Sequence, residues 1–508
     1  MSAKVSIILP YYETEQDIVK AFDSVEKQTM TDWELIIFDE RWNTKDYGKP
    51  LPEKITKNPK VKIFTRAHRN AAALWNDGID ISSGEYIIVL PPNIYYKPQL
   101  LEKYLNEFSK NGKNAVVFSS FDILKTGGNV IQHRLYPYIG QIEEAVDFGF
   151  VRMYKKDPVI EKGYFNEDLN YAEEYDMRLK LTDDDKYTIG FVDEYLYTAD
   201  ITKEAKEEEG SFTKLCSPGL GGKGSFSYLL YSRKEEREYE FVFKEMLKRR
   251  NAFLTKRNEI VKYSPDEKFD VMVSVVIPIL NRKRFIKNTI QKVLEGTYQN
   301  FEIIVVNGST DGTQAEVLSI KDKRIKLIQH NGKSIAEALN VGIKNARGKY
   351  IAQLDSDDEY VPETLETMVA HMESHPRCGL AVSYYNLIDE EGNVLDELPV
   401  VKHLEFDRNN ILRCGGAGAL RFFHKKVLVE MGYYDEENFG NFAEDYDMVV
   451  KISEKYDVDR VHKVLYRYRR HADNTDVTRD PFMKIRNKTL IRLNALKRRQ
   501  ELVKKGIR

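Results

Sequence analysis

The side chains best suited to chemistry in this sequence are two aspartates, Asp355 and Asp357, and a third that follows about ninety residues later. The pair follows the apolar run Tyr350–Leu354, which reads as a short strand. Residues two apart in an extended segment point the same way, so we expect the two carboxylates to converge. A divalent cation, Mg²⁺ or Mn²⁺, would relieve their repulsion and could clamp a departing diphosphate. A solvated acidic turn would give the same local pattern.

The third aspartate, Asp445, lies in a segment whose apolar residues have helical spacing. If Ala443–Ile452 is a helix, Met448 and Val449 lie on its buried face, and Asp445 shares that face in the first turn. A carboxylate aimed inward is costly unless it is paired, bound to metal or used in a reaction. Capping of the helix and a structural ion pair are the alternatives to catalysis.

The elements that must position these residues occur twice in the chain, about 264 to 271 residues apart. The matching segments are Val5–Glu13 with Val273–Asn281, Trp33–Asp39 with Phe301–Asn307, Ser83–Leu90 with Arg347–Leu354, and Tyr171–Met177 with Phe442–Met448. Four matches in one order predict two copies of one domain. The first copy keeps an acid, Glu174, at the position of Asp445, which favours function over chance there.

Each copy alternates short β-branched runs with helical stretches. In the second copy the expected strands are Ser274–Ile279, Glu302–Val306 and Lys326–Gln329, and the expected helices are Phe285–Leu294, Ile335–Asn345 and Pro362–Ser374. This order predicts an α/β fold with two tandem Rossmann-like domains. Each would have a mostly parallel sheet, with ligands bound beyond the carboxyl ends of its strands.

The chain is expected to divide into four parts: the first copy (1–200), a linker with a charged helix (201–270), the second copy (271–480) and a basic helix (481–508). The predicted linker helix covers Glu235–Val261. In the basic helix an apolar stripe contains Phe482, Ile485, Leu493 and Leu496. That helix could pack on the body of the protein, or it could rest on an anionic membrane surface.

Composition limits the class of protein. The chain has 508 residues, 42% of them apolar, and a net charge of −2, which argues against nucleic acid as an obligatory partner. The apolar runs are far shorter than the roughly 20 residues of a membrane span, and the start lacks a signal-peptide pattern. Three widely spaced cysteines suggest a reducing compartment. We expect a cytoplasmic protein, with contact to the inner face of the membrane left open.

Seven segments of the second copy match the sequence motifs of a known protein family. The matching segments are Val275–Pro278, Asn281-Arg282, Phe301–Thr313, Ala338–Ile343, Ala346–Ile351, Leu354–Asp358 and Glu444–Asp447. Together they resemble an inverting family-2 glycosyltransferase of the type-A (nucleotide-diphospho-sugar transferase) fold. The resemblance implies that Asp357 is the stronger metal ligand, that Asp445 is the base that deprotonates the acceptor, and that Glu444 holds the acceptor. The residues it assigns to the nucleotide sugar are Pro278, Asn281, Asn307, Asp311, Asn340 and Asp355.

Two further positions follow from the same resemblance. Members of the family often carry a metal-binding histidine after the last core strand, and His471 stands there. The family usually has two acidic residues before Gly-Ser-Thr-Asp, of which the first reads a uracil edge, but this sequence has only Asn307. Asn can still bind a base through its amide, with donors and acceptors that differ from those of a carboxylate.

The resemblance implies a metal-dependent hexosyl- or N-acetylhexosaminyltransferase. It would move a sugar from a nucleotide diphosphate, a UDP-sugar by the family's habit, to a hydroxyl of a glycan, lipid-linked sugar or protein. Assembly of surface polysaccharide or glycoconjugates is the family's commonest setting. Two alternatives stay open: a two-domain polymerase that alternates two sugars, and a carbohydrate-binding scaffold without turnover.

The first copy lacks the residues that are predicted to bind the metal ion in the second copy. Pro91-Pro92-Asn93 stands where the aspartate pair should be, and proline supplies no side-chain ligand. Asp39 survives at the base-reading position and Glu174 at the position of the catalytic base. A metal-dependent transferase is not expected here. A degenerate folding domain, a binding domain and a metal-independent transferase are the alternatives.

Overall fold

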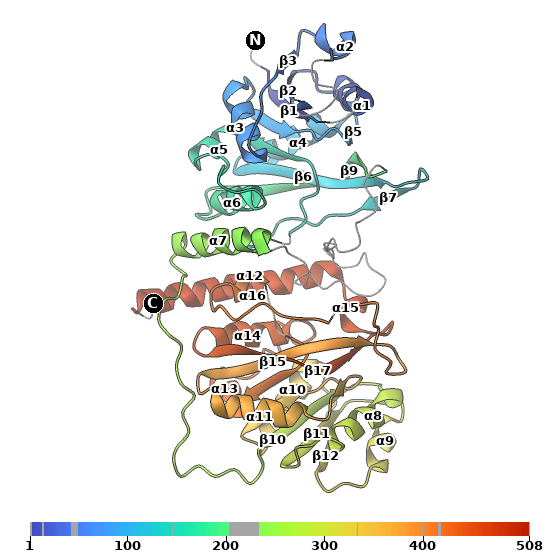
Figure 1. The fold of residues 1–508 in the computed structure, drawn as a ribbon, viewed down its shortest axis with the longest axis vertical. Coiled ribbons are helices and arrows are strands. Elements are labelled where there is room, and N and C mark those ends of the chain that lie inside the picture. Colours follow the sequence, from blue (N-terminus) through green and yellow to red (C-terminus); the bar gives the residue numbers. More distant parts are fainter. Residues whose placement is uncertain are drawn as a thin grey trace. The chain divides into compact units, whose positions relative to one another are not determined.

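The computed structural model describes residues 3–12, 15–41, 49–144, 146–202, 233–332, 334–398, 400–414 and 418–506. The described residues form two compact units, one up to residue 250 and the other from Asn251 onward. Each unit contains one extended sheet with helices packed against it (Figure 1).

The first unit begins with a parallel βαβ arrangement and ends on a helix. Its elements are β1 (Val5–Tyr11), α1 (Glu15–Glu26), β2 (Trp33–Asp39), α2 (Glu53–Thr56), β3 (Val61–Phe64), α3 (Ala71–Ile81), β4 (Tyr86–Val89), β5 (Ile94–Tyr96), α4 (Leu100–Lys110), β6 (Asn114–Leu124), β7 (Val130–His133), β8 (Arg152–Lys155), α5 (Lys156–Glu161), α6 (Glu173–Leu181), β9 (Thr188–Asp200) and α7 (Arg233–Arg249).

The second unit repeats the series and adds a long terminal helix. Its elements are β10 (Val273–Ile279), α8 (Lys283–Leu294), β11 (Phe301–Asn307), α9 (Thr313–Ser319), β12 (Ile325–Gln329), α10 (Ile335–Asn345), β13 (Tyr350–Gln353), β14 (Glu359–Tyr360), α11 (Thr364–Ser374), β15 (Cys378–Ile388), α12 (Ile411–Cys414), β16 (Arg421–His424), α13 (Lys425–Glu430), α14 (Glu444–Ser453), β17 (Asp457–Arg469), α15 (Thr475–Thr478) and α16 (Pro481–Lys504). The six strands and helices expected here begin and end within two residues of their predicted bounds.

The two sheets have the same topology, which confirms the duplication. The strand order is β3-β2-β1-β4-β8-β6-β9-β5 in the first sheet, where β7 also pairs with β6, and β12-β11-β10-β13-β16-β15-β17-β14 in the second. In the second sheet β12, β11, β10 and β13 are parallel neighbours, whereas β16 lies antiparallel between β13 and β15. The predicted α/β class with mostly parallel sheets is therefore confirmed.

Alternate residues of the central strand β10 enter separate cores on the two faces of the sheet. Val275 and Ile277 pack with residues of α8 and α11, and Val276 packs with residues of α10 and α14. Because both faces are covered, β10 is apolar along its length rather than alternating. Ser274 near the start of β10 is buried and donates to Glu302 of β11 at 2.7 Å, whereas the predicted site lies at the carboxyl ends of the strands.

Two predictions about the connecting parts need correction. The charged linker helix is present as α7, but it ends at Arg249 rather than Val261, and it packs on α6 in the first unit. Glu238 of α7 accepts hydrogen bonds from the backbone N–H groups of Asn170 and Tyr171, each at 2.8 Å, which explains this attachment. Beyond Arg250 the chain belongs to the second unit.

The predicted apolar stripe of the terminal helix is also wrong in part. In α16 Leu496 is buried, but much of the buried face is polar and includes Arg492 and Arg499. Arg492 Nε donates to the carbonyl of Leu412 at 2.7 Å, and Arg499 Nη2 donates to the carbonyl of Arg408 at 2.6 Å. These arginines attach α16 to its own unit. Within the described part of the chain, no helix has the length and apolar character that crossing a membrane requires.

One hydrogen-bonded latch is the same in both units. Asn340 on α10 donates to the carbonyl of Tyr434 at 2.9 Å and accepts from its N–H at 3.0 Å. Asn76 on α3 makes the same two bonds with Phe165, at 2.9 and 3.1 Å. The latch persists in the copy that lacks the aspartate pair, so it serves the scaffold. The predicted contact of Asn340 with the nucleotide sugar is a separate matter that stays a prediction.

We expect Asn340→Ala to lower the free energy of unfolding of the second unit by about 2–4 kcal/mol, because the buried N–H and C=O of Tyr434 would lose their partners. Asn76→Ala should cost the first unit a similar amount. Urea unfolding of each variant tests this, with Asn345→Ala, an exposed position at the end of α10, as the control. Unchanged stability in both variants would contradict the assignment.

Candidate active site

Asp357 and His471 meet at the carboxyl edge of the second sheet. Asp357 lies in the turn after β13, and His471 follows β17. Asp357 Oδ2 lies 3.0 Å from His471 Nε2 and 3.1 Å from Arg282 Nε. The His471 ring stacks on Phe285, and its side chain is only 1% exposed. Asp357 and His471, which were both predicted to bind a metal ion, are 114 residues apart in the sequence. The structure brings their side chains into contact.

The carboxylates of the pair have opposite electrostatic surroundings. Burial, together with the neighbouring charges of Asp357 and Asp445, raises the pKa of Asp355 to about 6, although Arg421 opposes the shift. Burial also acts on Asp357, but the hydrogen bond from His471 and the charge of Arg282 outweigh it and hold its pKa below the usual value. Asp355 Oδ1 is buried and has no hydrogen-bond partner among the residues that the structure describes. An unpartnered carboxylate oxygen beside a carboxylate–imidazole pair fits a divalent cation.

The next acid of the run has a structural role. Asp358 is buried, and it accepts hydrogen bonds from the Tyr466 hydroxyl and from the backbone N–H of Arg469, both at 2.7 Å. These bonds fix the turn to β17. Arg469 Nε donates to the carbonyl of Asp357 at 2.7 Å, which holds the same turn from its other side. The turn is therefore anchored on the strand that leads to His471.

Asp445 forms an ion pair with Arg421 in the first turn of α14. Its Oδ2 pairs with Arg421 Nη2, and its Oδ1 accepts from the backbone N–H of Tyr446 at 2.7 Å. The Asp445 side chain is 22% exposed, so a substrate hydroxyl can reach it. The structural ion pair, one of the alternatives for Asp445, is present. It leaves the carboxylate accessible and does not exclude catalysis.

Sequence reasoning missed Arg421. It opens β16, and its register partner on β13 is Gln353, two residues before Asp355. This antiparallel pairing carries the guanidinium to the same edge as the aspartates. A signal was available in the repeat, because Arg152 occupies the equivalent place in the first copy, after Val151 where the second copy has Leu420.

Glu444 is buried at the start of the same helix. Burial and the charge of Asp445 raise its pKa to about 8, although Arg421 opposes the shift. The carboxyl group therefore holds its proton near neutral pH in the folded chain. A protonated carboxylic acid can donate a hydrogen bond as well as accept one, which suits the predicted contact with an acceptor.

The other predicted nucleotide-sugar residues shape the loops at this edge. Asn281, with a left-handed φ of 55°, accepts from the N–H of Thr310 at 2.9 Å. Asp311 accepts from the N–H of Thr313 at 3.0 Å, where α9 begins. Pro278 lies beyond the last pair of β10 with β13, at Val276, so its missing N–H costs that pairing nothing.

Asn307 is fully buried, and both atoms of its amide are engaged within the protein. Its Nδ2 donates to Gln329 Oε1 at 3.0 Å, and its Oδ1 accepts from the N–H of Ser309 at 3.1 Å. These bonds join the end of β11 to β12 and to the following loop. The predicted reading of a base by Asn307 stays a prediction, and it would require one of these bonds to be shared or exchanged.

The first copy presents the same edge without the aspartate pair. Pro91 and Asn93 occupy the positions of Asp355 and Asp357. Arg152 on β8 nevertheless pairs with Glu174 on α6, with Nε 3.0 Å from Oε1. This ion pair corresponds to the pair between Arg421 and Asp445.

Comparison with known proteins identifies the repeated domain. Residues 6–162 and 274–432 each match the model of the family described as Glycosyl transferase family 2. The chain belongs to this family. Because the two stretches cover the parallel strands β1–β4 and β10–β13, each unit is a family-2 copy with the type-A fold.

Several other proteins are similar to parts of this chain. An uncharacterized glycosyltransferase of Rickettsia bellii is 26% identical over 423 residues, which are 78% of this chain and 59% of the relative. A chondroitin synthase of Escherichia coli is 26% identical over 44% of this chain and 34% of its own length. The solved structure of S. aureus TarS 1-349 with UDP-GlcNAc is 19% identical, with a TM-score of 0.36, and covers 41% of this chain and 62% of that one.

The surviving acids of the first family-2 copy are both paired. Arg41 binds Asp39 through Nε at 2.8 Å and Nη2 at 2.7 Å, and these bonds lower the pKa of Asp39. The Arg41 guanidinium also lies over the ring of Tyr11, 4.5 Å from its centroid. Asp39 at the predicted base-reading position is therefore held by a neighbouring cation, whereas the second copy has a neutral Asn307 there.

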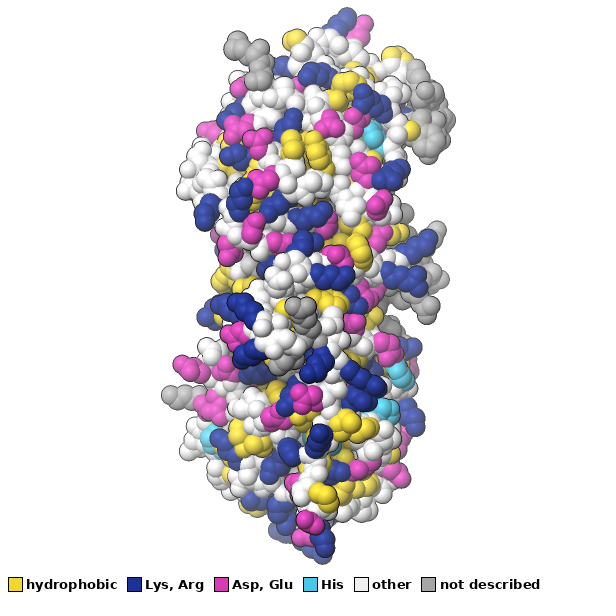
Figure 2. Space-filling view, turned by 90° about the vertical axis from the view of Figure 1, so that its left-hand side faces the viewer, with side chains coloured by type: hydrophobic (Ala, Val, Ile, Leu, Met, Phe, Trp, Pro, Cys, Tyr) yellow, Lys and Arg dark blue, Asp and Glu magenta, His cyan; other side chains and the backbone are white. Residues whose placement is uncertain are grey.

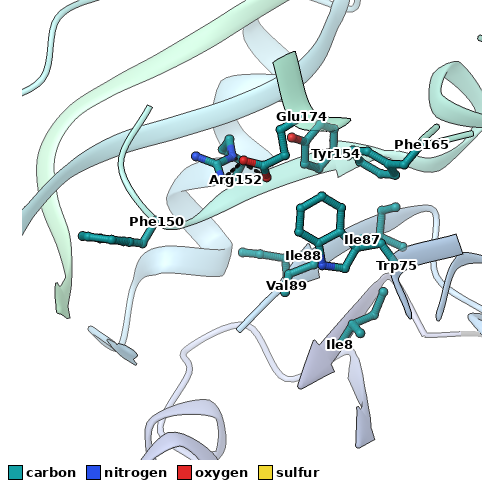
Figure 3. A pocket seen from close by; sticks show the side chains of 10 residues that line it. All are labelled: Ile8, Trp75, Ile87, Ile88, Val89, Phe150, Arg152, Tyr154, Phe165 and Glu174. Carbon is teal, nitrogen blue, oxygen red and sulfur yellow. Dashed lines mark hydrogen bonds and ion pairs between the residues drawn. The ribbon is translucent and has the colours of Figure 1, made fainter. Parts of the chain in front are cut away.

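The pocket beside Glu174 is largely apolar. Figure 3 shows the ring of Trp75 beneath the Arg152–Glu174 pair, with Phe165 beside it and Ile8 below. In the second family-2 copy the position of Phe165 is Tyr434, whose hydroxyl donates to Gln353 Oε1 at 2.8 Å. At this position the first copy therefore has an aromatic ring without a hydroxyl group, and it keeps the ion pair.

We expect Glu444→Gln to remove a pH dependence of stability. The pKa of this carboxyl is about 8 in the folded chain, against an ordinary value of 4.5. Between these values the unfolded chain loses the proton first, so the free energy of unfolding falls as pH rises, by up to about 1.4 kcal/mol per pH unit. Urea unfolding across this range should show a shallower fall in Glu444→Gln, whereas the exposed Glu437→Gln should match the parent. Equal slopes in all three proteins would contradict the assignment.

Proposed function

We propose that the second copy is a metal-dependent, inverting glycosyltransferase. It transfers a sugar from a nucleotide-diphosphate sugar, a UDP-sugar by family habit, to a hydroxyl of an acceptor. The observation that carries the proposal is the meeting of two different groups at one edge of the sheet. The first group is Asp355, Asp357 and His471, which can bind a cation and, through it, a diphosphate. The second is the accessible carboxylate of Asp445, which can accept a proton.

Asp357 and His471 would hold the cation, with Asp355 as a further ligand. The 3.0 Å between Asp357 Oδ2 and His471 Nε2 is close to the separation of neighbouring ligands on one ion, and the orphaned Asp355 Oδ1 supplies an oxygen. When bound, Mg²⁺ or Mn²⁺ would neutralise charge on the diphosphate as it leaves. Arg282, which already contacts Asp357, adds a fixed positive charge to the same place.

Asp445 would take the proton of the acceptor hydroxyl. As the acceptor oxygen forms its bond to the anomeric carbon, the bond from that carbon to the phosphate oxygen breaks, and its electron pair stays on the diphosphate. A single displacement of this kind inverts the anomeric centre. Arg421 orients the carboxylate through their ion pair, while the protonated Glu444 beside it can hold a hydroxyl of the acceptor.

The acceptor is proposed as a class: a glycan, a lipid-linked sugar or a protein, in the assembly of surface polysaccharide or glycoconjugates. The name of the E. coli relative supports a polysaccharide. A polymerase that uses both copies is less well supported, because Pro91 and Asn93 supply no carboxylate to the first copy. We therefore assign the chemistry to the second copy alone.

The first test removes the metal ligand. In Asp357→Ala we expect metal-dependent transfer to fall by about 10²–10³-fold, because the charge of the departing diphosphate would lose its main support. Asn93→Ala is the matched control at the equivalent position of the first copy, and it should retain full activity. Transfer from a radiolabelled nucleotide sugar, with Mn²⁺ and with chelator, measures both. Full activity of Asp357→Ala in chelator would overturn the site.

The second test separates the base from donor binding. We expect Asp445→Asn to lower kcat by about 10²–10⁴-fold with little change in donor affinity, because the amide keeps the shape and the contact with Tyr446 but cannot accept the proton. Glu174→Gln, its counterpart in the first copy, should leave kcat unchanged. Single-turnover kinetics and calorimetric titration with the donor report the two quantities. Loss of donor affinity with an unaltered kcat would contradict the assignment.

A further inference from the structure

A second group of metal-binding side chains lies away from the proposed active site. It consists of His371 and His375 at the end of α11 and Asp459 on β17. Strands β13, β15 and β17 run in one direction, and the group lies near the starts of β15 and β17. Asp355 follows the end of β13, so the two groups lie at opposite edges of the sheet.

The three side chains are already close enough to share one ion. His371 Nε2 lies 3.0 Å from Asp459 Oδ2, and the two imidazole rings are stacked, with centroids 3.9 Å apart and planes 14° from parallel. One ligand atom of each residue lies within 4.8 Å of the others. His371 lies in the last turn of α11 and His375 directly follows the helix, and the stacking shows that the two rings lie side by side.

Hydrogen bonding prepares His375 as a ligand. Its Nδ1 lies 2.8 Å from the carbonyl oxygen of His371, and a carbonyl can only accept, so Nδ1 carries the proton. The lone pair is then on Nε2. A ring N–H that donates to a backbone carbonyl is the usual support of a metal-binding histidine, because it fixes the tautomer and the orientation of the ring. The His375 side chain is exposed and can adjust to an ion.

We propose that His371, His375 and Asp459 form a Zn²⁺ site, with water as the fourth ligand. Ligands about 2.0–2.1 Å from a tetrahedral ion are roughly 3.3 Å apart, close to the 3.0 Å between His371 and Asp459. Zn²⁺ would take the place of the proton in the hydrogen bond between His371 Nε2 and Asp459 Oδ2. Two imidazoles favour Zn²⁺ over Mg²⁺ or Mn²⁺, which prefer oxygen ligands. The site is independent of the proposed transferase activity.

A neighbouring thiol stays outside the ligand set. Cys378 begins β15, and its Sγ–H donates to the carbonyl of Leu380 at 3.1 Å. The group whose ligand atoms lie within 4.8 Å of one another does not include Cys378. The ligand set is therefore two nitrogens and one oxygen.

The ion would fasten the edge at which the chain enters the second unit. Val261 donates its N–H to the carbonyl of Pro376 at 2.8 Å, directly after His375, and Asn258 Nδ2 donates to Asp457 Oδ1 at 2.8 Å. The entering segment thus contacts both elements that carry the ligands, α11 through the turn that follows it and β17 at its start. Zinc at this place would stabilise the unit against unfolding without altering the carboxyl edge.

The test is a calorimetric titration of the full chain, stripped with chelator, with Zn²⁺ in excess Mg²⁺ to occupy the proposed active site. We expect one zinc ion per chain and a rise in Tm. His375→Ala and Asp459→Asn should each weaken binding by at least about tenfold. His462→Ala, an exposed histidine on β17 that pairs with Glu405, is the matched control and should bind as the parent does.

The outcomes distinguish this site from the active site. Visible absorption of bound Co²⁺ should have tetrahedral intensity in the parent and in Asp357→Asn but not in His375→Ala, with circular dichroism to show that each variant is folded. Zinc affinity that is unchanged in both His375→Ala and Asp459→Asn would overturn the proposal. So would loss of the zinc site in Asp357→Asn, because the ion would then belong to the active site.

Discussion

The ion pair between Arg421 and Asp445 joins the two halves of the candidate site. Arg421 lies on β16, beside the strand that ends in the aspartate pair, and Asp445 begins a helix on the face of the sheet. A partly buried ion pair of this kind costs desolvation, and loss of one partner leaves an uncompensated charge worth about 3–5 kcal/mol. Its position depends on the antiparallel insertion of β16 between β13 and β15, which run in the same direction. The first copy keeps the pair as Arg152 and Glu174, although it lacks the aspartates, so the pair also serves the fold.

Much of the fold and part of the site could be predicted because their signals are local or repeated. The strand–helix alternation follows from runs of β-branched residues and from helical spacing, and the duplication follows from segments that recur in one order. The meeting of Asp357 with His471 could be predicted only through the resemblance, since no local pattern brings residues so distant in sequence together. Surface charge is of mixed sign, as the small net charge suggests, with Lys and Arg interspersed among Asp and Glu on the face drawn in Figure 2.

The remaining features depend on contacts that no periodicity encodes. Arg421 was missed because a single charged residue on a short strand resembles any strand terminus until the strand order is known. The buried face of α16 was misjudged because arginines such as Arg492 and Arg499 reach backbone carbonyls, which a count of apolar residues does not include. The hydrogen bonds of Asn340 with Tyr434 could not be predicted, because a family motif does not separate a scaffold role from a contact with substrate. The predicted contact of Asn340 with the nucleotide sugar stays a prediction.

The aromatic pocket of the first copy limits how easily the side-chain arrangement of the second copy could be restored there. Two substitutions would restore aspartates at Pro91 and Asn93, but the floor would still be Trp75 and Phe165, with valine at the position of Gln353. The Tyr434 hydroxyl, which donates to Gln353 in the second copy, would still have no counterpart there. Recovery would thus need several coordinated changes, each unfavourable alone. That requirement makes the structural difference between the copies hard to reverse in evolution.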